Sequence, residues 1–200
     1  MHNKIDFDNV NDNRLFDKMV VSSFPEILPL KDLFEKNEWH NETTYDHVRN
    51  VFINMNKFFT DNFDINLDKD ILYYAAIYHD IGKLETIRIS PDEATSFPNH
   101  ESISAEKLPE QKIISVLGEE RFNLLKTLIA KHADIHKILD NKKEYITLLG
   151  EYKRDFRNLF LENIILTLCD IKNSHLVETD EQEYNFRAGV LEEFINKEIS

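Results

Sequence analysis

Glycine and proline are scarce in this chain, and that scarcity constrains its fold more than any other feature. Only four glycines and five prolines occur in 200 residues. A β-sandwich or β-barrel needs turn residues roughly every 8–12 positions, and this sequence does not supply them. Apolar residues make up 42% of the chain, which is enough for a sizeable core. The sequence therefore predicts an all-α fold.

A helix is well marked between about Thr43 and Thr60. Apolar side chains recur there at steps of three and four, and Thr43 is a suitable N-cap. A second helix starts near Asp68 and runs through DILYYAAIYHD, with Gly82 expected in the left-handed conformation that closes many helices. Further helices are expected for the segment from His100, which Pro109 splits into two, for Glu119 to about His132, for Asn158 to about Ser174, and for residues 183–198.

The remaining segments are polar or contain proline. Residues 1 to about 20 are rich in Asn and Asp, and we expect them to be loosely ordered. SSFPEILPLKDLFEKN holds two prolines, with a short amphipathic helix expected after them. RISPDEATSFPN is typical of a loop, although ETIRIS, which overlaps it, is compatible with a short extended piece. The sequence contains no internal repeat.

The formal net charge is −13, and it narrows the range of partners. So acidic a surface repels long nucleic acids, which argues against a DNA duplex as the ligand but allows a small phosphorylated ligand in a local basic pocket. The only cysteine, Cys169, lies in an apolar run and is expected to be a buried thiol. No apolar run approaches 18 residues, so we expect no membrane contact and a cytoplasmic location.

The stretch YHDIGK, residues 78–83, places two ionisable side chains at the end of an apolar helix. His79 continues the buried face of that helix. Asp80 lies at its C-terminal end, where the helix dipole and burial both disfavour a carboxylate. A bound divalent cation would reverse both penalties. An exposed aspartate beside a core histidine that bonds a backbone carbonyl is the ordinary alternative for an isolated pair.

Further histidines lie on other predicted helices, and the pair is therefore not isolated. His47 and His132 border apolar faces, and His100 opens a helix directly after a proline-containing loop. Each alone is more often structural, but several imidazoles directed into one core with carboxylates are typical of metal sites in helical bundles. His136 lies four residues after His132 and could replace it, since both would share one helical face. Asp170 belongs to a narrow polar stripe that fits a solvent face and an internal polar cavity equally well.

The order His47, His79-Asp80, Asp170 resembles the HD superfamily of metal-dependent phosphohydrolases, in which HDIGK is a common form of the central motif. The resemblance covers roughly residues 40–176. FPNHESISA and KHADIH also resemble segments of the HD domain of bacterial tRNA nucleotidyltransferases. The resemblance implies an all-α bundle with a central metal site and three parts: an N-terminal extension with a short helix (1–39), the HD domain (40–176) and a C-terminal helix packed on that domain (177–200).

The resemblance also implies the ligands. His47, His79, Asp80 and Asp170 match the one-metal set, and His100 and His132 match the extra ligands of two-metal members, in which Asp80 bridges the ions. The cofactor is then one or two divalent ions, drawn from Mn, Ni, Co, Fe, Mg or Zn. Asp80 and Lys83 are the expected catalytic residues. Lys83 is also a candidate phosphate contact, unless it only pairs with a carboxylate, and Arg88, Lys131 and Lys137 are weaker candidates.

The implied function is hydrolysis of a nucleotide, a 2′,3′-cyclic phosphate or an RNA terminal phosphate by metal-activated water. The 200 residues leave no room for a nucleotidyltransferase domain, so addition of nucleotides to tRNA is not expected. Two other classes stay open. Some HD-fold proteins hold two irons with the same ligand types and activate oxygen, and a structural metal in a non-catalytic interaction module would use the same side chains. The sequence specifies no oligomeric state.

Overall fold

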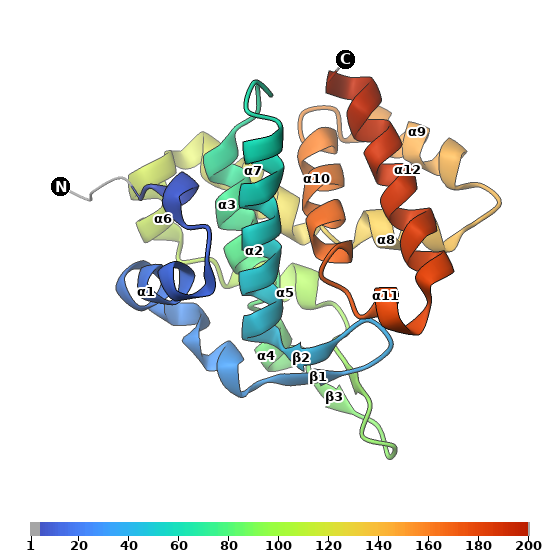
Figure 1. Ribbon diagram of the computed structural model, residues 1–200. Helices are drawn as coiled ribbons and strands as arrows, with labels where there is room; N and C mark the ends of the chain where they lie inside the picture. The colour runs from blue at the N-terminus through green and yellow to red at the C-terminus, as the bar shows by residue number, and fades with distance from the viewer. Residues whose placement is uncertain (1–4, 200) are drawn as a thin grey trace.

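The computed structural model describes residues 5–199, and it confirms the all-α prediction. Helices make up most of these residues, and the strands form only two small antiparallel hairpins, β1–β2 and β3–β4 (Figure 1). The α-helices are α1 Asn13–Ser23, α2 Thr44–Asp61, α3 Lys69–Tyr78, α4 Lys83–Thr86, α5 His100–Glu106, α6 Glu110–Leu117, α7 Glu119–Ala130, α8 Asp134–Asp140, α9 Tyr145–Asp155, α10 Phe160–Ile171, α11 Leu176–Thr179 and α12 Glu181–Ile199. Two 3₁₀-helices, η1 Phe7–Asn9 and η2 Pro25–Asp32, and the strands β1 Phe34–Lys36, β2 Asn41–Thr43, β3 Arg88–Ile89 and β4 Thr95–Ser96 complete the fold.

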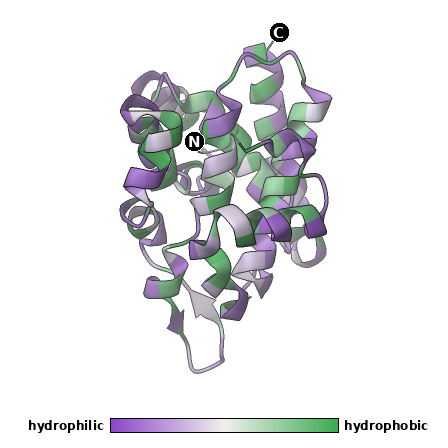
Figure 2. Ribbon diagram, turned by 90° about the vertical axis from the view of Figure 1, so that its left-hand side faces the viewer, coloured by the Kyte–Doolittle hydropathy of each residue, from purple (hydrophilic) through white to green (hydrophobic). Residues whose placement is uncertain are grey.

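Helix α2 lies at the centre of the fold and packs against both α3 and α10. Its predicted cap is confirmed, because the Thr43 side chain accepts a hydrogen bond from the Asp46 backbone N–H. Its apolar stripe is buried, with Val48, Phe52 and Met55 fully inaccessible to solvent. Helix α7 packs on α3 and α5, and α12 lies along α10. In Figure 2, hydrophobic and hydrophilic residues alternate along the helical ribbons, as expected for helices with one buried side.

The N-terminal region is ordered over its described part, so the prediction of loose order is wrong for residues 5–20. Residues 1–4 lie outside the described residues. Phe7 and Phe16 are buried, and the Phe7 ring lies 5.0 Å from the ring of Tyr73 and 6.1 Å from that of Phe52. The apolar residues among the Asn and Asp therefore decide the outcome, because burying two aromatic rings more than offsets the polar composition.

The short amphipathic helix expected after the two prolines is also wrong. Both prolines lie inside η2, and the next residues form β1, which pairs with β2 in the register Phe34 to Thr43. The loop between these strands is closed by the Asn37 side chain, whose Oδ1 accepts hydrogen bonds from the backbone N–H groups of Trp39 and His40. This β1–β2 hairpin lies beside the start of α2 and reaches the candidate site.

Gly82 does not adopt the predicted left-handed conformation, since its φ is −71°. Its role is steric. A Cβ atom at this position would lie 2.5 Å from the His100 carbonyl oxygen and 2.5 Å from the Ser104 nitrogen. The Gly82 N–H donates instead to the Ser104 hydroxyl. Glycine therefore permits the close approach of α5 to the end of α3.

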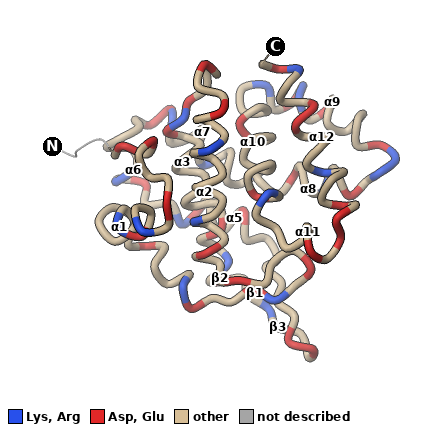
Figure 3. The backbone as a smooth tube through the Cα atoms, viewed as in Figure 1, with Lys and Arg blue, Asp and Glu red and all other residues tan. Residues whose placement is uncertain are grey.

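The predicted split at Pro109 is confirmed, because α5 ends at Glu106 and α6 begins at Glu110. Cys169 is a buried free thiol, as expected. Acidic side chains are distributed over the surface of the whole fold (Figure 3). Among the described residues, no helix combines the length and the apolar character needed to cross a lipid bilayer.

Candidate metal centre

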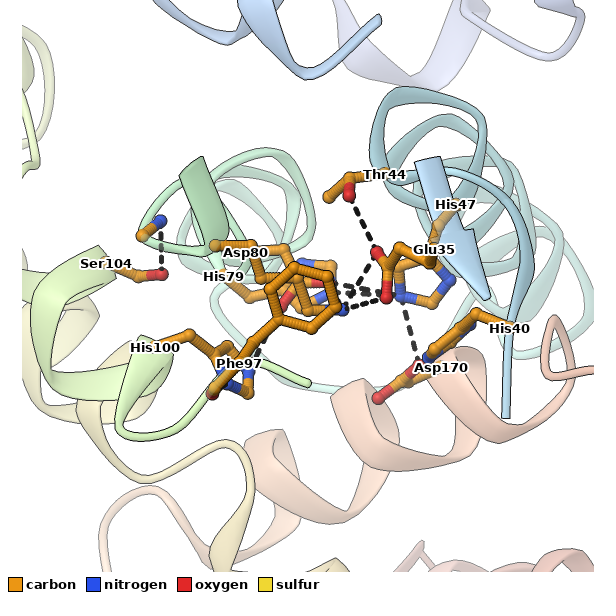
Figure 4. A network of polar contacts seen from close by, with 12 residues as sticks. Glu35, His40, Thr44, His47, His79, Asp80, Phe97, His100, Ser104 and Asp170 are labelled. Carbon is orange, nitrogen blue, oxygen red and sulfur yellow. Dashed lines mark hydrogen bonds and ion pairs between the residues drawn. The ribbon is translucent and has the colours of Figure 1, made fainter. Parts of the chain in front are cut away.

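Six residues predicted as metal ligands lie together in the interior, although they come from different elements. His47 lies in the first turns of α2, His79 and Asp80 follow α3, and His100 begins α5. His132 lies in the turn after α7, and Asp170 lies in the last turn of α10. The short spacing between α3 and α5 at Gly82 brings His100 to Asp80. Figure 4 shows most of these side chains converging on one point.

The Asp80 carboxylate lies at the middle of the cluster and faces a pair of histidines with each oxygen. Its Oδ2 lies 3.4 Å from His47 Nε2 and 3.3 Å from His79 Nε2. Its Oδ1 lies 3.2 Å from His100 Nε2 and 3.8 Å from His132 Nε2. The side chains therefore form two groups of potential metal ligands that share Asp80.

The ring orientations direct the Nε2 atoms of the histidines at Asp80. In three of the histidines, Nδ1 lies within hydrogen-bond distance of the carbonyl oxygen three residues earlier: His79 with Ala76 at 3.0 Å, His100 with Phe97 at 2.9 Å and His132 with Ile129 at 2.7 Å. Because a carbonyl only accepts, the neutral ring in each case carries its proton on Nδ1, and that tautomer offers the electron pair of Nε2 to a metal. His100 Nε2 and His132 Nε2 lie 3.2 Å apart. A bound cation would stabilise two electron-pair donors that lie this close to each other and to a carboxylate.

The charges around Asp80 keep it ionised. Burial alone would raise the pKa of Asp80, but the positive charges of His79 and Lys83 hold it well below its usual value. Burial, reinforced by the charges of His100 and His79, lowers the pKa of His132 to about 3. The group facing Asp80 Oδ1 thus includes a neutral imidazole at pH 7, the form in which histidine binds metals.

Asp170 belongs to the ligand group on the Oδ2 side of Asp80, next to His47. Its Oδ1 lies 3.2 Å from His47 Nε2 and its Oδ2 lies 3.1 Å from His136 Nε2. The polar stripe that carries it faces inward, because Asn163 and Thr167 are buried. Burial opposes a charge on His47, but hydrogen bonds to Asp170 and Glu42 raise its pKa to about 10. Without metal His47 therefore holds a proton at pH 7, and metal binding would release it.

Lys83 is buried and lies between two carboxylates. Its Nζ lies 2.8 Å from Asp80 Oδ2 and donates to both oxygens of Glu35 at 3.0 Å and 2.9 Å. Glu35 itself is fully buried on β1 and accepts from the Thr44 hydroxyl at 2.7 Å. Lys83 thus forms ion pairs with carboxylates, which the sequence left open as the alternative to a phosphate contact. These attractions raise the pKa of Lys83, although burial alone would lower it.

Two adjoining cavities reach the cluster. The first, of about 270 Å³, is lined by residues that include Asp80, His100, His132, Asp170 and Lys137. The second, of about 330 Å³, lies between the two hairpins and includes Phe97 and Trp39 in its lining. Four residues line both cavities: Trp39, His40, Lys83 and His100. Among the weaker phosphate candidates, Lys137 lines the first cavity, whereas Lys131 and the exposed Arg88 line neither.

Three residues of the site carry no signal in the helical pattern, because they lie on the β1–β2 hairpin: Glu35, Trp39 and His40. His136 also differs from its prediction as a replacement for His132. Helix α7 ends at Ala130, so the two histidines do not share a helical face. His132 faces Asp80, whereas His136 faces Asp170 and its ring meets that of Trp39 edge-on at 5.7 Å.

This helical bundle brings histidines and aspartates together from separate helices, and such a set of side chains could hold a divalent metal. The family model of the HD domain matches residues 44–172, which is well over half of the chain, and the protein belongs to the HD-domain family. Members of that family are generally metal-dependent phosphohydrolases that bind divalent metals. No curated protein is found to match the chain. The likeness to the HD domain of tRNA nucleotidyltransferases stays a prediction.

Proposed function

We propose that this protein is a metal-dependent phosphohydrolase that cleaves a small phosphoester: a nucleotide, a 2′,3′-cyclic phosphate or an RNA terminal phosphate. The observation that carries the proposal is the set of histidine Nε2 atoms that face the two oxygens of Asp80, while the Nδ1 atoms of His79 and His100 face backbone carbonyls. His47, His79, Asp80 and Asp170 would hold one ion, and Asp80, His100 and His132 a second. A bound divalent cation would supply a Lewis acid that activates water at neutral pH and neutralises phosphoryl charge.

Side chains of the protein itself would bind the phosphoryl group of the substrate. The cavity of about 270 Å³ has room for a phosphoryl group beside the cluster, and Lys137 places a cationic group in its wall. Lys83 lines the same cavity, and we propose it as the inner phosphate contact, held in position by Glu35. Positive groups that face the phosphoryl oxygens stabilise the charge that develops during displacement.

The adjoining cavity suits the uncharged part of the substrate. Its lining includes the aromatic rings of Phe97 and Trp39 and the amide of Asn37. Aromatic rings stack on nucleobases of any sequence, which supports a nucleoside on this side of the scissile bond. Glu38 in the same wall would repel a second phosphate, so we propose a substrate with its phosphate at one end.

The test is turnover of a phosphoester panel by protein loaded with Mn²⁺, Co²⁺, Ni²⁺, Fe²⁺ or Mg²⁺. We expect hydrolysis of at least one nucleotide or cyclic phosphate, and Asp80→Asn should reduce kcat/KM by more than about 1000-fold, because it weakens both groups of ligands. Activity that survives this substitution contradicts the assigned site. Protein isolated with two irons and a mixed-valence spectrum, without phosphoester turnover, would favour the oxygenase class.

A further inference from the structure

His40 lies next to the cluster but outside the residues that the family model matches. It ends the loop of the β1–β2 hairpin, before residue 44 where the family match begins. Its ring lies 4.3 Å from that of His47, centre to centre, and Figure 4 shows it beside Asp170. His40, His47 and Asp170 each offer a ligand atom, and these three atoms lie within 4.8 Å of one another.

The bonding of His40 differs from that of its neighbours. The Nδ1 atoms of His79, His100 and His132 all lie at hydrogen-bond distance from backbone carbonyls. His40 Nδ1 is buried and has no hydrogen-bond partner within residues 5–199. A buried imidazole nitrogen without a partner is costly unless something outside the chain satisfies it. A cation beside His47 and Asp170 would do so.

His47 decides how many ions this side of the cluster can hold. Its Nε2 faces Asp170 at 3.2 Å and also faces Asp80 at 3.4 Å. Its Nδ1 is turned away, toward Asn173 at 3.2 Å. An imidazole nitrogen has one electron pair and binds one ion. The group with His40 and Asp170 and the group with His79 and Asp80 therefore describe a single ion.

The hairpin loop that carries His40 is fixed from the opposite end of the chain. The backbone N–H of His175 donates to the Trp39 carbonyl at 2.6 Å, and the Thr179 hydroxyl donates to the Glu38 carbonyl at 3.2 Å. The guanidinium of Arg187, on α12, lies 4.6 Å from the centre of the Trp39 ring. A ligand must be held within about 0.5 Å to act as one, and these contacts provide that support.

We propose that His40 is a metal ligand, and that it completes a set of five side chains around one ion: His40, His47, His79, Asp80 and Asp170. The other ion has three side chains of this chain, Asp80, His100 and His132. Since closed donor sets retain ions and open ones leave positions for water and substrate, the first ion is the permanent one and the second ion is the exchangeable one that faces substrate. The proposal rests on the metal centre of the proposed function.

The test measures ion binding in the full chain, independently of turnover. Equilibrium dialysis against Co²⁺ alone should show one tight and one weaker ion per chain. His40→Ala should weaken the tight ion by more than about tenfold, as even outer-sphere changes cost 10–100-fold, and should alter the Co²⁺ visible spectrum. His40→Gln should act in the same direction. His175→Ala is the matched control, because it keeps the backbone N–H that supports the loop and removes only a side chain that pairs with Glu178. It should bind both ions as the unaltered chain does.

If His40→Ala fails to fold, a measurement on the unaltered protein still tests the proposal. Fully Co²⁺-loaded protein with labelled histidine should show five contact-shifted imidazoles by NMR, whereas four would contradict the proposal. Unchanged affinity and an unchanged spectrum in folded His40→Ala would also contradict it. The proposed function fails separately, either when the chain binds no metal, in which case this inference falls too, or when loaded protein hydrolyses no phosphoester while the His40 effects persist.

Discussion

The two oxygens of Asp80 meet different surroundings. The histidines on the Oδ2 side, His47 and His79, are almost fully buried and line neither cavity. On the Oδ1 side, His100 and His132 line the cavity of about 270 Å³, and the His100 side chain is 19% exposed. On our proposal, one carboxylate would separate two tasks, with the Oδ2 side retaining an ion and the Oδ1 side presenting one to substrate.

Among the changes that distinguish the two sides of Asp80, the largest effect is expected from removing one histidine on each side in turn. His132→Ala should leave one tightly bound ion per chain and lose the second. His79→Ala should weaken the tight ion instead, and both variants should lose about 100-fold or more in kcat/KM. Metal content after dialysis, measured beside activity, checks this. Equal losses of both ions in the two variants would break the comparison, since the sides would then act as one unit.

Glu35→Gln tests the support beneath the Oδ2 side. In this variant Lys83 would keep its ion pair with Asp80 but lose the one with the fully buried carboxylate of Glu35. Removing one partner of a buried ion pair lowers the free energy of unfolding by about 3 kcal/mol. Urea denaturation of metal-free protein measures it. The control is Glu93→Gln on the exposed pair with Lys36, whose side chains are 79% and 54% exposed, where the loss should stay below about 1 kcal/mol. Similar stabilities for the two variants would contradict the role of Glu35.

Gly82→Ala tests the junction that brings His100 to the Oδ1 side. The added Cβ meets backbone atoms at 2.5 Å, so α5 must shift, at an expected cost of about 1–3 kcal/mol. The shift carries His100 away from Asp80, and the weaker ion should lose affinity while the tight one keeps it. Gly150→Ala is the control, because nothing lies within 4 Å of its Cβ. Loss of the tight ion in Gly82→Ala would contradict the separation of the two sides.

Helical periodicity predicted much of this fold, but only the part that depends on local pattern. The burial of α2 and the cap at Thr43 follow from spacing within one helix. The role of Gly82 depends on α5, a separate helix. The hairpin that carries His40 forms through pairing of two three-residue strands, too short to produce a visible alternation.

The candidate site was likewise predicted where the signal is written in the sequence, and missed where it depends on contacts between distant elements. The resemblance pointed to the six histidines and aspartates, because family order is written in the sequence, and the structure brings those six together. His136 was misplaced because the end of α7 at Ala130 breaks the helical register before His132. Glu35 could not be recognised, since its partner Lys83 is 48 residues away. Long-range pairing of this kind leaves no periodic signal.

The smallest expected effect comes from Lys137, in the wall of the cavity on the Oδ1 side of Asp80. Lys137 lines the cavity beside His132, is 61% exposed and pairs with Glu101 at 2.7 Å. Lys137→Ala should raise KM for a phosphoester about two- to fivefold at unchanged kcat, because an exposed charge contributes only about 0.2–1 kcal/mol. The effect should shrink as salt is added. Lys131→Ala removes the same charge outside the cavity and should leave KM unchanged. Equal KM values for the two variants would contradict substrate entry from the His132 side and, with it, the assignment of the exchangeable ion to that side.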